Sequence, residues 1–192
     1  MKNRISVGLT ALMLFAAAGI CGDGGRSVKI GNQIWTAENL NDASKGGICY
    51  KNKHSNCEKY GRLYTWDEAM KACPAGWRLP SFEEWRTLTA YVGNNSAPKL
   101  KARSGWKNYH DESGNGTDEY GFSALPGGYY RDGALSALTD TYFILEGFEG
   151  YWWTASEQGT SAWYRNIGNN GSDGSGSYSD KTSMLSVRCL KK

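Results

Sequence analysis

The sequence predicts a single α+β domain that is stapled by two disulfides. Capping-box motifs that begin at Thr65 and Ser81 predict the starts of two helices. Short β-prone runs separated by turn-rich segments dominate the C-terminal half, which is typical of an antiparallel sheet. Five cysteines are present, enough for two disulfides and one residue left over. We therefore expect two helices packed on a small antiparallel sheet with long loops.

The N-terminus has the pattern of an export signal. Two basic residues precede the apolar run 7–18, which is too short to span a bilayer. We therefore expect a signal peptide over residues 1–20, a flexible linker over 21–27 and one domain over 28–192. The mature protein is then expected outside the cytoplasm, either secreted or on the bacterial surface.

Charge and composition exclude some function classes. Hydrophobic residues make up 40% of the chain, which supports a folded core. The formal net charge is +3, but two of the basic residues lie in the expected leader. The mature surface is therefore close to neutral and gives no basis for nucleic-acid binding. Contact with a membrane is expected only through an N-terminal lipid anchor.

Four cysteines of the domain form an even set: Cys49, Cys57, Cys73 and Cys189. In an oxidising compartment such a set predicts two disulfides. We favour Cys49–Cys57, which closes a short loop, and Cys73–Cys189, which joins the end of the first helix to the last strand. Other pairings stay open at this stage. The longer loop should add about 4–5 kcal/mol to stability in the chain-entropy model.

The fifth cysteine, Cys21, lies where the expected leader ends and precedes a glycine-rich spacer. Acylation of this residue as the N-terminus of a lipoprotein would explain an unpaired thiol outside the cell. Ile20 counts against a lipoprotein, because a lipobox normally has a small residue directly before the cysteine. A lipid-anchored and a secreted protein therefore both remain open, and the unpaired cysteine favours the anchor.

Local patterns predict the individual elements. The runs 28–30 and 33–35 flank Gly31 and Asn32 and predict a hairpin, and the polar segment 42–58 is expected to form a small stapled loop. Pro74 and Gly93 are expected to end the two helices. Apolar residues at helical spacing are expected to face the core, namely Trp66, Ala69, Met70 and Cys73 in the first helix and Trp85, Leu88 and Val92 in the second.

The C-terminal half is expected to form a meander. Strands are predicted over 151–156, 162–167 and 185–190, with a loop over 169–180 between the last two. Because adjacent strand residues point to opposite faces, one of Trp152 and Trp153 should be buried and the other can face outward.

Several motifs, taken in order, resemble those of one family. They are YGRLYTW at 60–66, CPAGWRLPS at 73–81, GFSALPGG at 121–128, WWTAS at 152–156 and SVRC at 186–189. Together they resemble the Fibrobacter succinogenes major paralogous domain over about residues 28–191. That domain is found in many bacterial lipoproteins and cell-surface proteins, and its biochemical function is not established. The resemblance therefore implies an envelope or surface location without implying a reaction.

The order of elements and the expected pairing of Cys73 with Cys189 are also similar to the C-type lectin-like fold. The segment 77–81, followed by Glu84 and Trp85, is similar to the formylglycine-generating, sulfatase-modifying branch of that fold, which is an analogy at the level of the fold. That branch needs reactive cysteines. Because the domain cysteines are expected in disulfides, the analogy gives an enzyme only as the alternative function.

Patterns for other chemistry are weak. His54 and His110 lie in polar loop sequence, no nucleophile elbow is present, and Cys49 and Cys57 lack the spacing of a zinc site. The loop from Asp111 to Glu119 partly matches a calcium-binding loop. However, Phe122 stands where a bidentate glutamate is needed, and the segment is interpreted as a turn-rich loop. We expect no cofactor and no catalytic residue, and calcium binding at this loop stays open.

Aromatic residues supply the remaining functional signal, at 13% of the chain. Aromatic rings pack on the apolar faces of sugar rings, and neighbouring polar groups bind the hydroxyls. A turn at 126–128 is expected to expose the residues that follow it. The sequence therefore predicts an exported binding module for a glycan or a surface protein, with a purely structural envelope domain as a further alternative. Its shallow site is expected to contain Trp106, Tyr129, Tyr130, Arg131 and Trp163.

Overall fold

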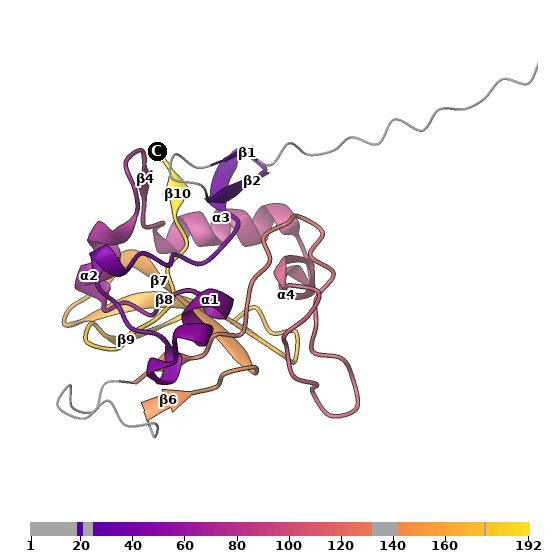
Figure 1. Ribbon diagram of the computed structural model, residues 1–192. Coiled ribbons are helices and arrows are strands. Elements are labelled where there is room, and N and C mark those ends of the chain that lie inside the picture. The colour runs from indigo at the N-terminus through magenta and orange to yellow at the C-terminus, as the bar shows by residue number, and fades with distance from the viewer. Residues whose placement is uncertain (1–18, 21–24, 132–141, 175) are drawn as a thin grey trace, which may run out of the picture.

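The computed structural model describes residues 19–20, 25–131, 142–174 and 176–192, and it confirms the α+β class (Figure 1). The helices are α1 (His54–Tyr60), α2 (Trp66–Ala72), α3 (Phe82–Val92) and α4 (Ser96–Leu100), with 3-10 turns η1 (Ala43–Lys45) and η2 (Tyr50–Asn52). The strands are β1 (Gly19–Ile20), β2 (Arg26–Ile30), β3 (Gln33–Thr36), β4 (Trp77–Arg78), β5 (Tyr129–Tyr130), β6 (Phe143–Ile144), β7 (Glu149–Gln158), β8 (Ser161–Gly168), β9 (Ser177–Asp180) and β10 (Leu190–Lys191).

The strands form three antiparallel sheets where one small sheet was expected. The five-stranded sheet has the order β1-β2-β3-β10-β4, and β5-β6 and β7-β8-β9 form two further sheets. Only β7 and β8 are long, with 10 and 8 residues, while the other strands have five residues or fewer. Strands this short, separated by long loops, cannot continue one hydrogen-bonded ladder through the domain.

The predicted hairpin and both predicted helices are confirmed. β2 and β3 pair in register around the turn at Gly31 and Asn32, and capping boxes at Thr65 and Ser81 begin α2 and α3. Met70 was expected in the core, but it is 43% exposed. The reason is that α2 has only seven residues and buries a narrow face, whose members are Trp66, Ala69 and Ala72.

Arg78 of β4 fixes the start of α3. Its guanidinium pairs with both carboxylate oxygens of Glu84, and Nη1 lies 2.6 Å from Oε2. The same Oε2 accepts a hydrogen bond from the Ser81 backbone N–H at 2.8 Å, which completes the capping box. The hydrogen bonds from Arg78 hold the pKa of the Glu84 carboxyl below its ordinary value. One carboxylate therefore links the sheet to the helix.

Replacing Glu84 by glutamine is expected to lower the free energy of unfolding by about 1 kcal/mol at neutral pH. A carboxyl whose pKa is lowered by folding stabilises the protein above its unfolded pKa, and the contribution is lost as the pH falls through the folded pKa. Urea unfolding should therefore show the full difference between wild type and variant at neutral pH and a progressively smaller one as the pH falls below the ordinary pKa of a glutamate carboxyl. Glu83→Gln is the matched control, because Glu83 is exposed and its carboxylate pairs with Arg86 along the helix. A difference that does not change with pH would contradict the role of the Glu84 charge.

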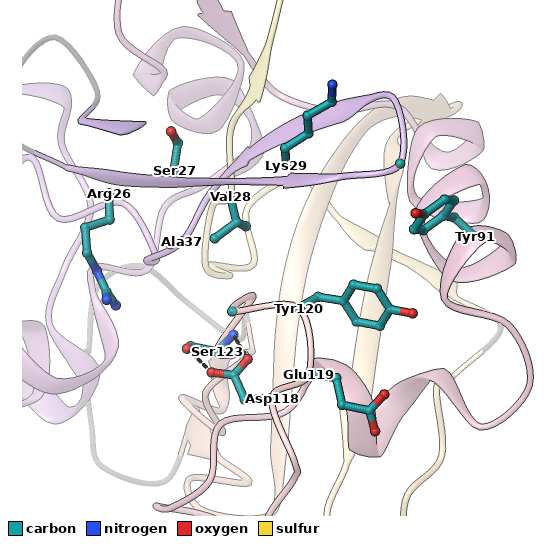
Figure 2. A pocket seen from close by; sticks show the side chains of 12 residues that line it. Arg26, Ser27, Val28, Lys29, Ala37, Tyr91, Asp118, Glu119, Tyr120 and Ser123 are labelled. Atoms are coloured by element: carbon teal, nitrogen blue, oxygen red, sulfur yellow. Dashed lines mark hydrogen bonds between the residues drawn. The ribbon is translucent and has the colours of Figure 1, made fainter. Parts of the chain in front are cut away.

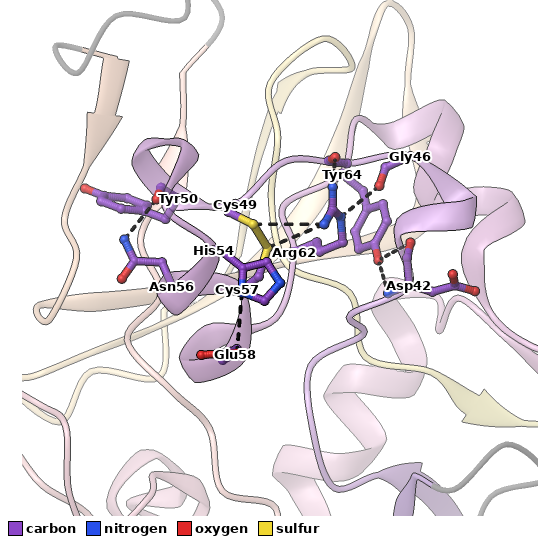
Figure 3. Close-up of a disulfide and its surroundings, with 11 residues drawn as sticks. Asp42, Gly46, Cys49, Tyr50, His54, Asn56, Cys57, Glu58, Arg62 and Tyr64 are labelled. Atoms are coloured by element: carbon purple, nitrogen blue, oxygen red, sulfur yellow. Dashed lines mark hydrogen bonds and ion pairs between the residues drawn. A yellow bond between two sulfur atoms is a disulfide. The ribbon is translucent and has the colours of Figure 1, made fainter.

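The two disulfides are those favoured from the sequence, Cys49–Cys57 and Cys73–Cys189. Figure 3 shows the shorter one beside Arg62, whose guanidinium donates to the Gly46 carbonyl at 3.0 Å. The segment 42–58 is more ordered than the predicted loop, because it contains two 3-10 turns and the beginning of α1. Disulfides of this kind are typical of proteins in oxidising compartments.

Residues 183–190 form a continuous buried segment that joins the three sheets. Met184 bridges to Tyr130 of β5, and Ser186 bridges to Trp152 of β7. Beyond them Leu190 lies between Trp35 of β3 and Arg78 of β4 as part of β10 (Figure 1). The sequence predicts a strand over 185–190, but of these residues only Leu190 belongs to a regular ladder, because the residues before it change partners from sheet to sheet.

Trp152 and Trp153 are both fully buried, so the prediction that one of them faces outward is wrong. Trp153 packs in a core cluster with α2, and Trp152 packs in a second cluster with Trp35 and Trp85. The sheet of β7 and β8 is therefore covered on both faces, and alternation places both indoles in a core. β9 also differs from the prediction, because it forms a strand within the segment 169–180 that was predicted to be a loop.

The predicted leader lies largely outside the described residues, as does Cys21, and the lipid anchor stays a prediction. Gly19 and Ile20, at the end of the predicted leader, form β1 beside β2. Across the portion of the chain that the structure describes, no helix combines the length and apolar character that crossing a bilayer needs.

Candidate functional site

The structure separates the five predicted site residues. Trp106 and Tyr130 are core residues, with 5% and 0% exposure, and their assignment to a surface site is wrong. Trp106 donates a hydrogen bond from Nε1 to the Ala124 carbonyl at 3.0 Å. Tyr130 packs inward against Phe143, with ring centroids 5.1 Å apart. Tyr129 and Arg131, the neighbours of Tyr130, face outward, because adjacent strand residues face opposite sides.

Trp163 is half-buried and lies apart from the other predicted residues. Its ring packs against Phe82 at 4.8 Å and against Tyr178 at 5.7 Å between centroids. Trp163 and Tyr164 are adjacent in β8, so their side chains point to opposite faces of the sheet. Trp163 therefore belongs to the face that packs on α3.

Tyr129 and Arg131 reach the surface together and border a small cavity of about 170 Å³. We call it the tyrosine–arginine cavity. Tyr151 of β7 and Tyr164 of β8 form its floor, on the same face of the sheet. The ring centroids of Tyr129 and Tyr151 are 4.5 Å apart, and those of Tyr151 and Tyr164 are 5.4 Å apart. The remaining lining residues are Tyr178, Ser179 and Leu185.

The cavity contains one cation and several hydroxyl groups. The exposed guanidinium of Arg131 donates to the Tyr129 hydroxyl, at 2.9 Å from Nη2 and 3.3 Å from Nε. Burial raises the pKa of Tyr151, and a hydrogen bond with Glu149 raises it further. Burial also raises the pKa of Tyr164. Both phenols therefore stay protonated at physiological pH and can donate as well as accept hydrogen bonds.

Comparison with known proteins identifies the chain at the level of a family. The model of the Fibrobacter succinogenes major domain matches residues 28–191. The chain belongs to this family. Searches of curated proteins and of solved structures found no significant match to the chain. The family resemblance that the motifs predicted is therefore confirmed.

The motifs of this Fibrobacter succinogenes major domain have structural roles in the described residues. The segment 73–81 supplies the disulfide at Cys73, the strand β4 and the cap of α3. The closing motif contributes Arg188, which is fully buried and donates to backbone carbonyls. These positions hold the fold together and lie outside the tyrosine–arginine cavity.

Tyr151 and Tyr164 complete the cavity, and both were missing from the predicted site. They lie on paired strands, where Tyr151 is opposite Asn166 and Tyr164 is opposite Trp153. The two tyrosines are therefore diagonal neighbours on one face of the sheet. Period-two alternation along the two strands is the signal that would have found them, but it requires knowledge of the register.

The remaining polar candidates have local partners. Asp118 accepts hydrogen bonds from the backbone N–H and the hydroxyl of Ser123, and Asn115 accepts from the backbone N–H of Trp106. These bonds are the local contacts expected of a turn-rich loop. Where the structure describes the chain, no group of three or more His, Cys, Asp or Glu side chains is placed to hold a metal ion. His54 and His110 are both exposed.

Proposed function

We propose that this family member is a non-catalytic binding module outside the cytoplasm, and that it binds a terminal sugar unit of a glycan in the tyrosine–arginine cavity. The observation that carries the proposal is the convergence of tyrosine hydroxyls and the Arg131 guanidinium on one small cavity. Sugar hydroxyls both donate and accept hydrogen bonds, and so do protonated phenols. The volume of about 170 Å³ suits one ring better than a longer segment.

The cysteines support a module without catalysis. An enzyme of the sulfatase-modifying branch needs reactive thiols, whereas the four cysteines from Cys49 to Cys189 form disulfides. A C-type lectin-like arrangement of the domain is part of the proposal, and the bond from the end of α2 to the last strand supports it. Export by the N-terminal leader, with a lipid on Cys21, would place the module on the cell surface.

Replacing Tyr129 or Arg131 by alanine is expected to weaken glycan binding by about 2- to 10-fold, since one ring contact or one hydrogen bond contributes about 0.5–1.5 kcal/mol. The melting temperature should hardly change for Arg131→Ala, because Arg131 is exposed, and should fall slightly for Tyr129→Ala, because Tyr129 is half-buried and packs against Tyr151. Tyr130→Ala should instead destabilise the fold by about 3–5 kcal/mol, because the ring is fully buried. A glycan array on the oxidised protein would identify the ligand, and calorimetric titration would compare the variants.

Arg103→Ala is the matched control for Arg131→Ala, because Arg103 is also exposed and lies outside the cavity. It should leave glycan binding unchanged. If no glycan on the array binds, the proposal is wrong. A structural envelope domain, whose partner is another protein, would then be the better explanation of the fold.

A further inference from the structure

A second hollow lies between β2 and the loop 118–123, and we call it the hairpin groove (Figure 2). It has a volume of about 720 Å³ and shares no lining residue with the tyrosine–arginine cavity. Small-molecule sites commonly measure roughly 300–1,000 Å³, so the groove is large enough for a ligand of several rings. Nothing in the proposed function uses it.

One wall of the groove is aromatic. Tyr91 of α3 is 60% exposed, which is unusual for a large ring, and its centroid lies 6.2 Å from that of Tyr120. The Tyr91 ring packs over the hairpin turn, where a Cβ atom on Gly31 would lie only 2.8 Å from Cδ2. Gly31 has φ of +59°, so the turn also requires glycine for its backbone. The ring is thus held in place with much of its surface exposed to solvent.

The loop that carries Tyr120 also supplies a polar group that is held in place. The Asp118 carboxylate accepts from the Ser123 backbone N–H at 2.7 Å and from the Ser123 hydroxyl at 2.5 Å. Both residues have left-handed backbone conformations, with φ of 47° and 50°. Non-glycine residues in this conformation are uncommon and persist where the surrounding structure holds them, often at binding sites. Asp118 is therefore a pre-positioned acceptor at the groove, as Figure 2 shows.

Charged groups of both signs line the groove. Arg26 pairs with Glu38, with 3.2 Å between Nε and Oε1, and the other charged lining residues are Lys29, Asp118 and Glu119. A lining of mixed sign is not selective for an anion, and it offers both donors and acceptors. A ligand with many hydroxyl groups and no charge matches such a lining.

We infer that the hairpin groove is a second binding site, which takes a segment of an uncharged polysaccharide. Sugar rings would pack their C–H faces on Tyr91 and Tyr120, and their hydroxyls would bind the Asp118 side of the groove. Because the Tyr91 ring is already held, binding orders few additional side chains. The inference does not depend on the tyrosine–arginine cavity, since the two sites share no residue.

The test is calorimetric titration of the oxidised protein with neutral oligosaccharides of glucose, xylose, mannose and N-acetylglucosamine, each several units long. We expect at least one series to bind. Tyr91→Ala and Tyr120→Ala should each weaken that binding by about tenfold, with a normal melting temperature for Tyr91→Ala and a small decrease for Tyr120→Ala, whose ring packs partly on the core. Tyr109→Ala is the control, because Tyr109 is 45% exposed and lies outside both sites. It should leave the affinity unchanged.

Three results would overturn the inference. One is the absence of binding by every neutral oligosaccharide, and another is preferential binding of extended peptides over sugars in a parallel titration. The third is oligosaccharide binding that survives Tyr91→Ala and Tyr120→Ala but is lost in Arg131→Ala, which would assign the sugar to the tyrosine–arginine cavity and support the proposed function alone.

Discussion

Replacing Arg188 by methionine is expected to lower the free energy of unfolding by about 3–5 kcal/mol. The guanidinium is fully buried and makes four hydrogen bonds to neutral acceptors. They are Asn39 Oδ1 at 2.7 Å and the carbonyls of Thr36, Phe122 and Ser123 at 2.9, 2.7 and 3.0 Å. Truncation leaves these acceptors buried without this donor, and each such loss costs about 1–3 kcal/mol.

Two opposing effects determine the size of this loss. Burial lowers the pKa of Arg188, which means that keeping the charge in the core is costly, and methionine would remove that cost. The lost hydrogen bonds outweigh this gain, because four acceptors from two distant parts of the chain, 36–39 and 122–123, share the one side chain. Asn39 also accepts from Trp152 Nε1 at 2.8 Å, so the damage should spread into the core beside β7.

Urea unfolding followed by tryptophan fluorescence would measure the change in midpoint. Arg188→Lys should also be destabilised, because a lysine ammonium keeps the charge but cannot reproduce the planar fork of donors. Arg86→Met is the matched control, since Arg86 is 63% exposed and should change stability by no more than about 0.5 kcal/mol. A loss below about 1 kcal/mol in Arg188→Met would show that the carbonyls find other partners.

Local rules account for the parts of the fold that the sequence predicts well. The caps at Thr65 and Ser81 and the turn after Ile30 depend on residues within four positions, so they can be identified without tertiary contacts. β9 could not be predicted, because three of its four residues are polar and its pairing with β8 depends on tertiary contacts. The exposure of Met70 could not be predicted either, since its helical spacing fits a core position but the short helix buries another face.

The sequence predicted only some residues of the candidate site, because the direction of a strand side chain and the pairing of strands depend on tertiary contacts. Placing Tyr129, Tyr130 and Arg131 after a glycine turn correctly brings two of them to the surface, but the inward direction of Tyr130 depends on its pairing with Phe143. The floor of the cavity comes from Tyr151 and Tyr164, whose proximity depends on the register of β7 and β8. The sequence identifies the aromatic residues, but the strand register determines which of them are in contact.

The two disulfides should differ in their contributions to stability, because they close loops of different length. Cys73 and Cys189 are 116 residues apart, and Cys49 and Cys57 are 8 residues apart. In the chain-entropy model the longer loop contributes about 5 kcal/mol and the shorter about 2.5 kcal/mol, since cross-linking restricts the unfolded chain. Cys189 is also fully buried at the end of the segment that joins the three sheets.

The double variant Cys73→Ala/Cys189→Ala is therefore expected to lose about twice as much stability as Cys49→Ala/Cys57→Ala. Alanine is chosen because a serine at position 189 would bury a hydroxyl and add a separate cost. Urea unfolding of the two double variants, each a control for the other, measures the ratio. Peptide mapping without reduction should first find the two pairs, and a link from Cys57 to Cys73 would contradict the pairing. An equal loss in both variants would show that native contacts around each disulfide, rather than loop length, set its contribution.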